Sequence, residues 1–279
     1  MRLKSLMPLS ISILLISIVV LIYNYFQTGD FFLKDIDLKG GTSITIETNN
    51  PINSKELELK INEKFGSAII ASLKTSTGYG AKIEVEKNVN SDEVISTVKS
   101  LGINVISFSV ESIGSSLGEI FFQQLVYVLI VAFVLMSIVI FLIYRNPISS
   151  FGIVFAVLGN TLTTLAFTSL LGIKISFAGL AGLLMLIGYT VDTNIVLTNK
   201  VVRTTPEVFS SQYKKAFVTG VTLIATITLT MLAVFFLSTS KLLTNISSIL
   251  IIGFLTDLPY TWIFNAAVLE WWIKRKYKV

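Results

Sequence analysis

Long apolar runs separated by short polar breaks fill most of this sequence and predict six membrane-spanning helices. Four of the runs contain no charged residue, and each of the other two contains a single acid. A helix needs roughly 20 apolar residues to cross the hydrocarbon layer of a membrane, and every run is long enough. The runs cover residues 5–29, 120–144, 146–173, 175–199, 216–240 and 242–269.

The first run follows Arg2 and Lys4, as the apolar part of a secretory signal peptide would. Its apolar stretch is long, however, and no Ala-x-Ala-like cleavage site follows Phe26. We therefore expect an uncleaved anchor helix.

The polar segment between the first two runs, residues 27–119, has the pattern of a small α+β domain without a catalytic cluster. Apolar and polar residues alternate as in a half-buried strand or recur at helical spacing. The expected strands are 43–47, 68–74, 82–86 and 104–110, with a turn at 76–80 and helices that begin at Ser54 and Ser91. The order strand, helix, strand, strand, helix, strand is the split ferredoxin-like arrangement, which we interpret as a binding or coupling module.

The basic residues at the helix ends indicate the orientation. Six spans place both termini on one side of the membrane. That side carries eleven Lys or Arg residues near the helix ends, whereas the short loops of the other side carry only Lys174 and Lys241. Because basic residues are enriched on the cytoplasmic side, we expect a multi-pass plasma-membrane protein with cytoplasmic termini and an extracytoplasmic domain.

Composition excludes several function classes. Charged residues make up 14% of the chain, well below the roughly 25% of soluble domains. The sequence contains no Cys and no His, which removes thiolate or imidazole metal sites and the usual nucleophilic pairs. It also lacks a P-loop motif. We expect no metal, no cofactor, no nucleic-acid partner and no enzymatic activity.

Asp192 is the first acid within a predicted span. An ionisable side chain in the hydrocarbon layer costs about 2.5–3.5 kcal/mol on insertion scales and therefore demands a reason. Gly188, Asp192, Ile195 and Asn199 share one helix face, which we expect to point into the helix bundle. The carboxylate either responds to a proton or ion, or forms a structural hydrogen bond or salt bridge.

Asp257 is the second such acid and lies near the middle of the sixth run, with Gly253 on its face and Tyr260 one turn later. It either exchanges a proton or forms a permanent packing hydrogen bond. The third run adds Asn160 and several threonines. Threonines in membrane helices commonly bond their own backbone, so most of these are expected to be structural.

Several motifs together resemble the SecF proteins of the SecD/SecF family, in the resistance–nodulation–division superfamily. They are the run from Asp35 to Thr42, which contains Asp37, Gly40 and Gly41; Arg145-Asn146-Pro147; the run Gly188-Tyr189-Thr190-Val191-Asp192-Thr193-Asn194; and Asp257 with Thr261, Trp262 and Asn265. The last motif is similar to the archaeal branch. The resemblance covers nearly the whole chain and divides it into a first helix (1–26), an outer ferredoxin-like domain (27–119) and a five-helix bundle with a basic tail (120–279).

The resemblance implies an accessory subunit of the Sec protein-export machinery. Such a subunit pairs with a SecD-like protein, associates with the SecY translocon, and assists late translocation of a secreted polypeptide in response to the proton-motive force. The basic tail would contact the membrane surface or its anionic lipids. The alternatives are a stand-alone proton-linked transporter of lipids or small molecules, and a passive translocon scaffold.

The motif departs from the bacterial pattern at the acid. The proton-linked acid of the bacterial relatives aligns with Thr193, and Asp192 precedes it by one residue, or about 100° around a helix. The basic residue expected at the start of the fifth helix corresponds to Lys215. We take Asp192, Asp257 and Lys215 as candidates for proton coupling, with Gly188, Tyr189, Thr193, Asn194 and Asn160 as supporting residues.

Overall fold

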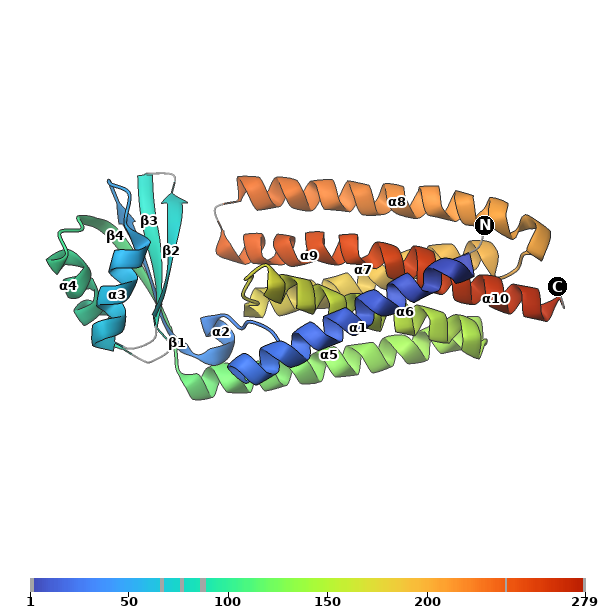
Figure 1. Cartoon of the computed structure of the whole chain (residues 1–279), viewed down its shortest axis with the longest axis horizontal. Helices are drawn as coiled ribbons and strands as arrows, with labels where there is room; N and C mark the ends of the chain where they lie inside the picture. Colours follow the sequence, from blue (N-terminus) through green and yellow to red (C-terminus); the bar gives the residue numbers. More distant parts are fainter. Residues whose placement is uncertain (1–2, 66–67, 76–77, 86–88, 239, 278–279) are drawn as a thin grey trace. The chain divides into compact units, whose positions relative to one another are not determined.

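The computed structural model describes residues 3–65, 68–75, 78–85, 89–238 and 240–277, and the chain divides into two compact units (Figure 1). One unit combines Met1–Leu33 with Tyr127–Val279, and the other is Lys34–Val126. Residues 76–77 of the expected turn and Glu86 of the expected third strand lie outside the described residues.

The first unit contains the membrane helices, and the prediction of six spans is confirmed for the residues that the structure describes. Pro147 and Pro206 each occupy a first helical turn, where the missing N–H leaves no hydrogen bond unmade. The spans are α1 (Leu3–Thr28), α5 (Ser115–Tyr144, which begins in the other unit), α6 (Pro147–Leu170), α7 (Phe177–Val201), α8 (Pro206–Leu237) and a composite of α9 (Lys241–Pro259), η1 (Tyr260–Asn265) and α10 (Ala266–Lys276).

Helix α9 is the centre of this unit, since it packs against α6, α7 and α8, while α1 crosses α6 (Figure 1). Most of α5 has an exposed apolar surface, as expected for a helix that contacts lipid. Gly179 allows α7 to approach α9 closely, because a Cβ there would overlap Asn245 and Ile249 of α9.

The sixth span contains a feature that the apolar pattern did not predict. Residues Tyr260–Asn265 form a π-helix directly after Pro259. π-Helical turns are rare and occur frequently at functional sites. Here the turn widens the helix next to Asp257.

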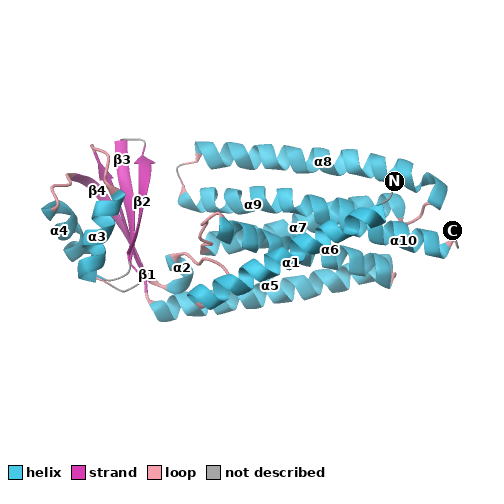
Figure 2. Ribbon diagram, in the orientation of Figure 1, coloured by secondary structure: helices cyan, strands magenta, loops and turns pink. Residues whose placement is uncertain are grey.

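The second unit is an antiparallel sheet in the order β2-β3-β1-β4, with α3 and α4 on one face (Figure 2). Ile44, Ile46 and Ile83 of the sheet pack with Leu57 of α3 and Val94 of α4. The predicted ferredoxin-like arrangement is therefore confirmed. Its elements are β1 (Gly41–Thr48), α3 (Ser54–Phe65), β2 (Ala68–Thr75), β3 (Gly78–Val85), α4 (Ser91–Ser100) and β4 (Val105–Ile113).

The Asp35–Thr42 run forms a short helix, α2 (Ile36–Lys39), and the turn into β1. Asp35 caps α2, and Gly40 has a φ of 78°, which favours glycine. Lys82 of β3 forms salt bridges with Asp35, at 3.5 Å, and with Glu84. Burial lowers the pKa of Lys82, but the hydrogen bonds and charges of Glu84 and Asp35 outweigh this effect and raise it above 10.5. The motif thus fixes the entry of the chain into the domain.

Candidate functional site: a buried polar network around Asp257

Asp257 lies at the meeting point of α7, α9 and η1 and has an exposed fraction of only 1%. The Thr261 hydroxyl donates to Oδ1 over 2.8 Å, and the Thr193 hydroxyl lies 3.0 Å from Oδ2. In the part of the chain that the structure describes, neither oxygen is paired with Lys or Arg. Asp257 is therefore not part of a salt bridge with any described residue. Its ionised form would be a buried charge without a counter-ion, which is costly.

The Thr193 hydroxyl has one hydrogen but two neighbouring acceptors. Its oxygen lies 2.9 Å from the Thr190 carbonyl and 3.0 Å from Asp257 Oδ2. When the carboxyl group is ionised, Thr193 can donate to it. When the carboxyl group is protonated, its O–H can donate to the Thr193 oxygen while Thr193 donates to the carbonyl. The same three groups therefore accommodate both protonation states through a change of hydrogen-bond direction.

The network continues from Asp257 along side-chain amides. Asn194 donates to the Thr261 hydroxyl over 2.7 Å, and Asn265 donates to Asn194 Oδ1, also over 2.7 Å. The π-helical turn positions both Thr261 and Asn265 toward α7. Asn265 Oδ1 abuts Gly152 of α6, where a Cβ would overlap it. Three helices thus meet around one continuous polar chain.

A second branch connects α6 to α9. Asn160 donates to Thr190 over 2.8 Å and accepts a hydrogen bond from Thr256 over 2.7 Å. Thr164 also contacts Thr256, at 3.0 Å. Each of these side chains is buried, and the branch lies one residue from Asp257.

The prediction that the face of Asp192 points into the bundle is wrong. Gly188, Asp192 and Asn199 share a face, as expected, but all three are exposed in the single chain. The opposite face of α7, which includes Leu186, Thr193 and Asn194, packs against α9 and η1. Both faces carry small and polar residues, so their composition could not show which one is buried.

The remaining candidates are partly buried in the network of Asp257 and partly exposed on the surface of the single chain. Asn160, Thr193 and Asn194 join the network of Asp257, whereas Lys215 is exposed on α8. Tyr189 is half-buried and packs edge-on against Phe254, with 5.4 Å between ring centroids. Sequence reasoning did not single out Thr256, although its position beside Asp257 was an available signal. No metal-binding group of three acidic residues occurs among the described residues.

Comparison with known proteins gives the family. The model of the family "Protein export membrane protein SecD/SecF, C-terminal" matches residues 93–275. A protein-export membrane protein SecF from Pyrococcus furiosus is 33% identical over 94% of this chain and 88% of its own length. A protein of the same name from Methanocaldococcus jannaschii is 34% identical over 86% of this chain and 87% of its own.

A solved structure shares the fold. The crystal structure of SecDF from Thermus thermophilus, described as a translocon-associated membrane protein, matches 97% of this chain with a TM-score of 0.80 at 18% identity. This chain spans 38% of that longer one. The family model, the archaeal relatives and the shared fold all point to the family that the sequence motifs resemble. The chain therefore belongs to the SecD/SecF family of protein-export membrane proteins, in its SecF branch.

Proposed function

We propose that this protein is the SecF-type half of a membrane assembly that assists late polypeptide export in response to the proton-motive force. The observation that carries the proposal is Asp257, a buried carboxyl group whose hydrogen bonds to Thr193 and Thr261 suit both protonation states. The acid of the bacterial relatives aligns with Thr193, the residue that contacts Asp257. The Asp257 carboxyl group would thus lie near the position of the bacterial acid, but it would be supplied by the sixth span instead of by α7.

Gain or loss of the Asp257 proton would change the contacts between α7 and the sixth span. Thr193 and Asn194 join α7 to this span through Asp257, Thr261 and Asn265. Reversal of the Thr193 hydrogen bond would change the relative stability of two arrangements of the interface between α7 and the sixth span. Such a change between packed helices is a common basis for conformational switching. The outer ferredoxin-like domain would convert the shift into movement of the emerging polypeptide.

The exposed face of α7 fits a second membrane protein. An exposed carboxylate within a span is unfavourable against lipid, by about 2.5–3.5 kcal/mol. Gly188 has open space where its Cβ would be, so another helix can approach closely. We assign the face of Gly188, Asp192 and Asn199, called here the partner face, to a SecD-like partner.

We also propose that both termini are cytoplasmic, because the basic residues are concentrated at the helix ends on that side of the membrane.

Strand β4 fits an extended polypeptide. It is the last strand in the sheet order, and Phe108 and Val110 are exposed although their register partners Ile46 and Ile44 are buried. A free strand edge with exposed apolar side chains can accept another strand. The polypeptide in transit is the proposed occupant.

A pull-down of the tagged protein in mild detergent tests the assembly. We expect a second six-helix protein with its own outer domain, together with translocon subunits. Recovery of this chain alone as a homo-oligomer would contradict the export assembly and would favour a stand-alone transporter.

A further inference from the structure

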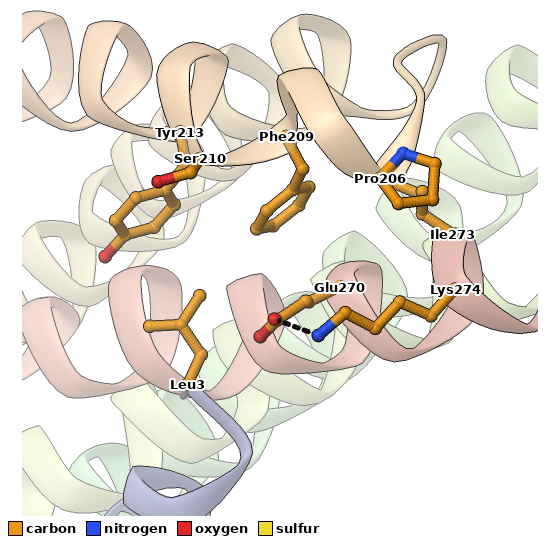
Figure 3. Close-up of a pocket in the computed structure, with 8 residues that line it drawn as sticks. All are labelled: Leu3, Pro206, Phe209, Ser210, Tyr213, Glu270, Ile273 and Lys274. Carbon is orange, nitrogen blue, oxygen red and sulfur yellow. Dashed lines mark hydrogen bonds and ion pairs between the residues drawn. The ribbon is translucent and has the colours of Figure 1, made fainter. Parts of the chain in front are cut away.

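A pocket of about 150 Å³ lies away from Asp257, between the first turns of α8 and helix α10 (Figure 3). Its volume is roughly ten times the minimum needed for one water molecule. Phe209 and Tyr213 of α8 and Leu3 of α1 supply apolar walls, whereas Glu270 and Lys274 of α10 supply charges. Neither the network of Asp257 nor the partner face includes these residues.

Glu270 gives the pocket its chemistry. Its exposed fraction is 6%. Oε1 accepts a hydrogen bond from Lys274 over 2.7 Å, but Oε2 is buried and has no hydrogen-bond partner among the described residues. A buried carboxylate oxygen without a donor is costly. The site therefore calls for a donor group, and a positive one would be bound most strongly.

The aromatic walls favour the same charge. The rings of Phe209 and Tyr213 stack with 6.2 Å between their centroids, and Figure 3 shows the Phe209 ring directed from α8 toward Glu270 and Lys274. Aromatic faces attract ammonium groups. The Tyr213 hydroxyl is already occupied, because it donates to the Trp262 carbonyl over 2.9 Å. Its ring is thereby fixed against the π-helix.

The position of the pocket indicates the source of the ammonium group. Two tryptophans follow Glu270 on α10 and form cation–π contacts, Trp271 with Arg275 and Trp272 with Lys276. Tryptophan with basic residues at a helix end marks the headgroup level of a membrane. The Lys274 side chain is 44% exposed, so its ammonium can also contact a phosphate.

We propose that this pocket binds the headgroup of an aminophospholipid, with the primary ammonium on Glu270 and the phosphate beside Lys274. A primary ammonium can donate hydrogen bonds to Oε2, whereas a quaternary ammonium cannot. The pocket thus distinguishes ethanolamine from choline and glycerol headgroups.

Native mass spectrometry of the full-length protein tests this assignment. The protein is reconstituted with equal amounts of phosphatidylethanolamine, phosphatidylcholine and phosphatidylglycerol, and the retained lipids are counted. We expect phosphatidylethanolamine to be enriched about fivefold over each of the others, which corresponds to about 1 kcal/mol. Equal retention of the three lipids would overturn the proposal, whether the pocket is empty or filled by the chain's own N-terminus.

Variants test the contributions of Glu270 and Lys274 to lipid binding separately. Glu270→Gln should abolish the enrichment, and Phe209→Leu, which keeps Glu270, should reduce it. Lys274→Ala should lower the total lipid retained but preserve the preference for ethanolamine. The matched control is Glu207→Gln, since Glu207 is exposed at the start of α8 and does not line the pocket. Unchanged enrichment in Glu270→Gln would refute the assignment, and Phe209→Leu decides the matter if Glu270→Gln does not fold.

Discussion

At the scale of single residues, the chemistry depends on how few partners Asp257 has. Two threonine hydroxyls contact its oxygens, and each hydroxyl can donate or accept. A salt bridge would hold the carboxylate in one charge state, whereas hydroxyl partners do not. The sequence predicted a buried acid here, and helical spacing places Thr261 four residues after it on the same side of the helix. Thr193, by contrast, comes from α7 and is 64 residues away in sequence. Helical periodicity cannot show such a contact between two helices.

Thr193 is the residue that tests this description. Thr193→Val keeps the shape of the side chain but leaves Asp257 Oδ2 without its partner, which costs about 1–3 kcal/mol. We expect a lower melting temperature of the purified protein and slower export in cells. Thr193→Ser restores the hydroxyl and should restore most of the export rate. Equal export by the Val and Ser variants would show that the hydroxyl is not needed.

At the scale of elements, apolar patterns predicted the six spans and the order of strands and helices in the outer domain. They did not predict the π-helix, because one extra residue per turn leaves a long apolar run unchanged. They also assigned the face of α7 wrongly, since Gly182 and Asn194, which are buried, resemble Gly188 and Asp192, which are exposed. Packing between helices, which the sequence does not display, decides between the two faces.

The two glycines Gly220 and Gly188 give a matched test of helix packing. A Cβ at Gly220 of α8 would overlap the Trp262 indole, whereas Gly188 of α7 has open space. Gly220→Leu should destabilise the isolated protein by about 1–3 kcal/mol or more through overpacking. Gly188→Leu should leave the melting temperature of the isolated protein within a degree or two of the wild type. Equal destabilisation would contradict the packing of α8 on η1.

Strand β4 is tested by a photo-crosslinking residue at Phe108. If an exported polypeptide adds to the free edge, the probe should crosslink to a stalled export substrate. The same probe at Leu59 of α3, which is 67% exposed, serves as the control and should give little product. Crosslinking of similar yield at both positions would indicate unspecific contact.

At the scale of the whole molecule, the proposed partner face would make this chain half of a larger assembly. Gly188→Trp should block approach of the partner and abolish co-purification of the SecD-like protein. Val139→Trp, on the exposed surface of α5, should not. If both variants recover the partner equally, the partner face lies elsewhere.

Export into sealed vesicles that contain the whole assembly, measured with and without an ionophore, tests whether Asp257 couples export to the proton gradient. We expect Asp257→Asn to lower export to the rate that the wild type shows after ionophore, and ionophore then to have no further effect. Asp192→Asn, on the partner face, should keep its response to ionophore. Export by Asp257→Asn at the wild-type rate, with full sensitivity to ionophore, would show that Asp257 is not the coupling group.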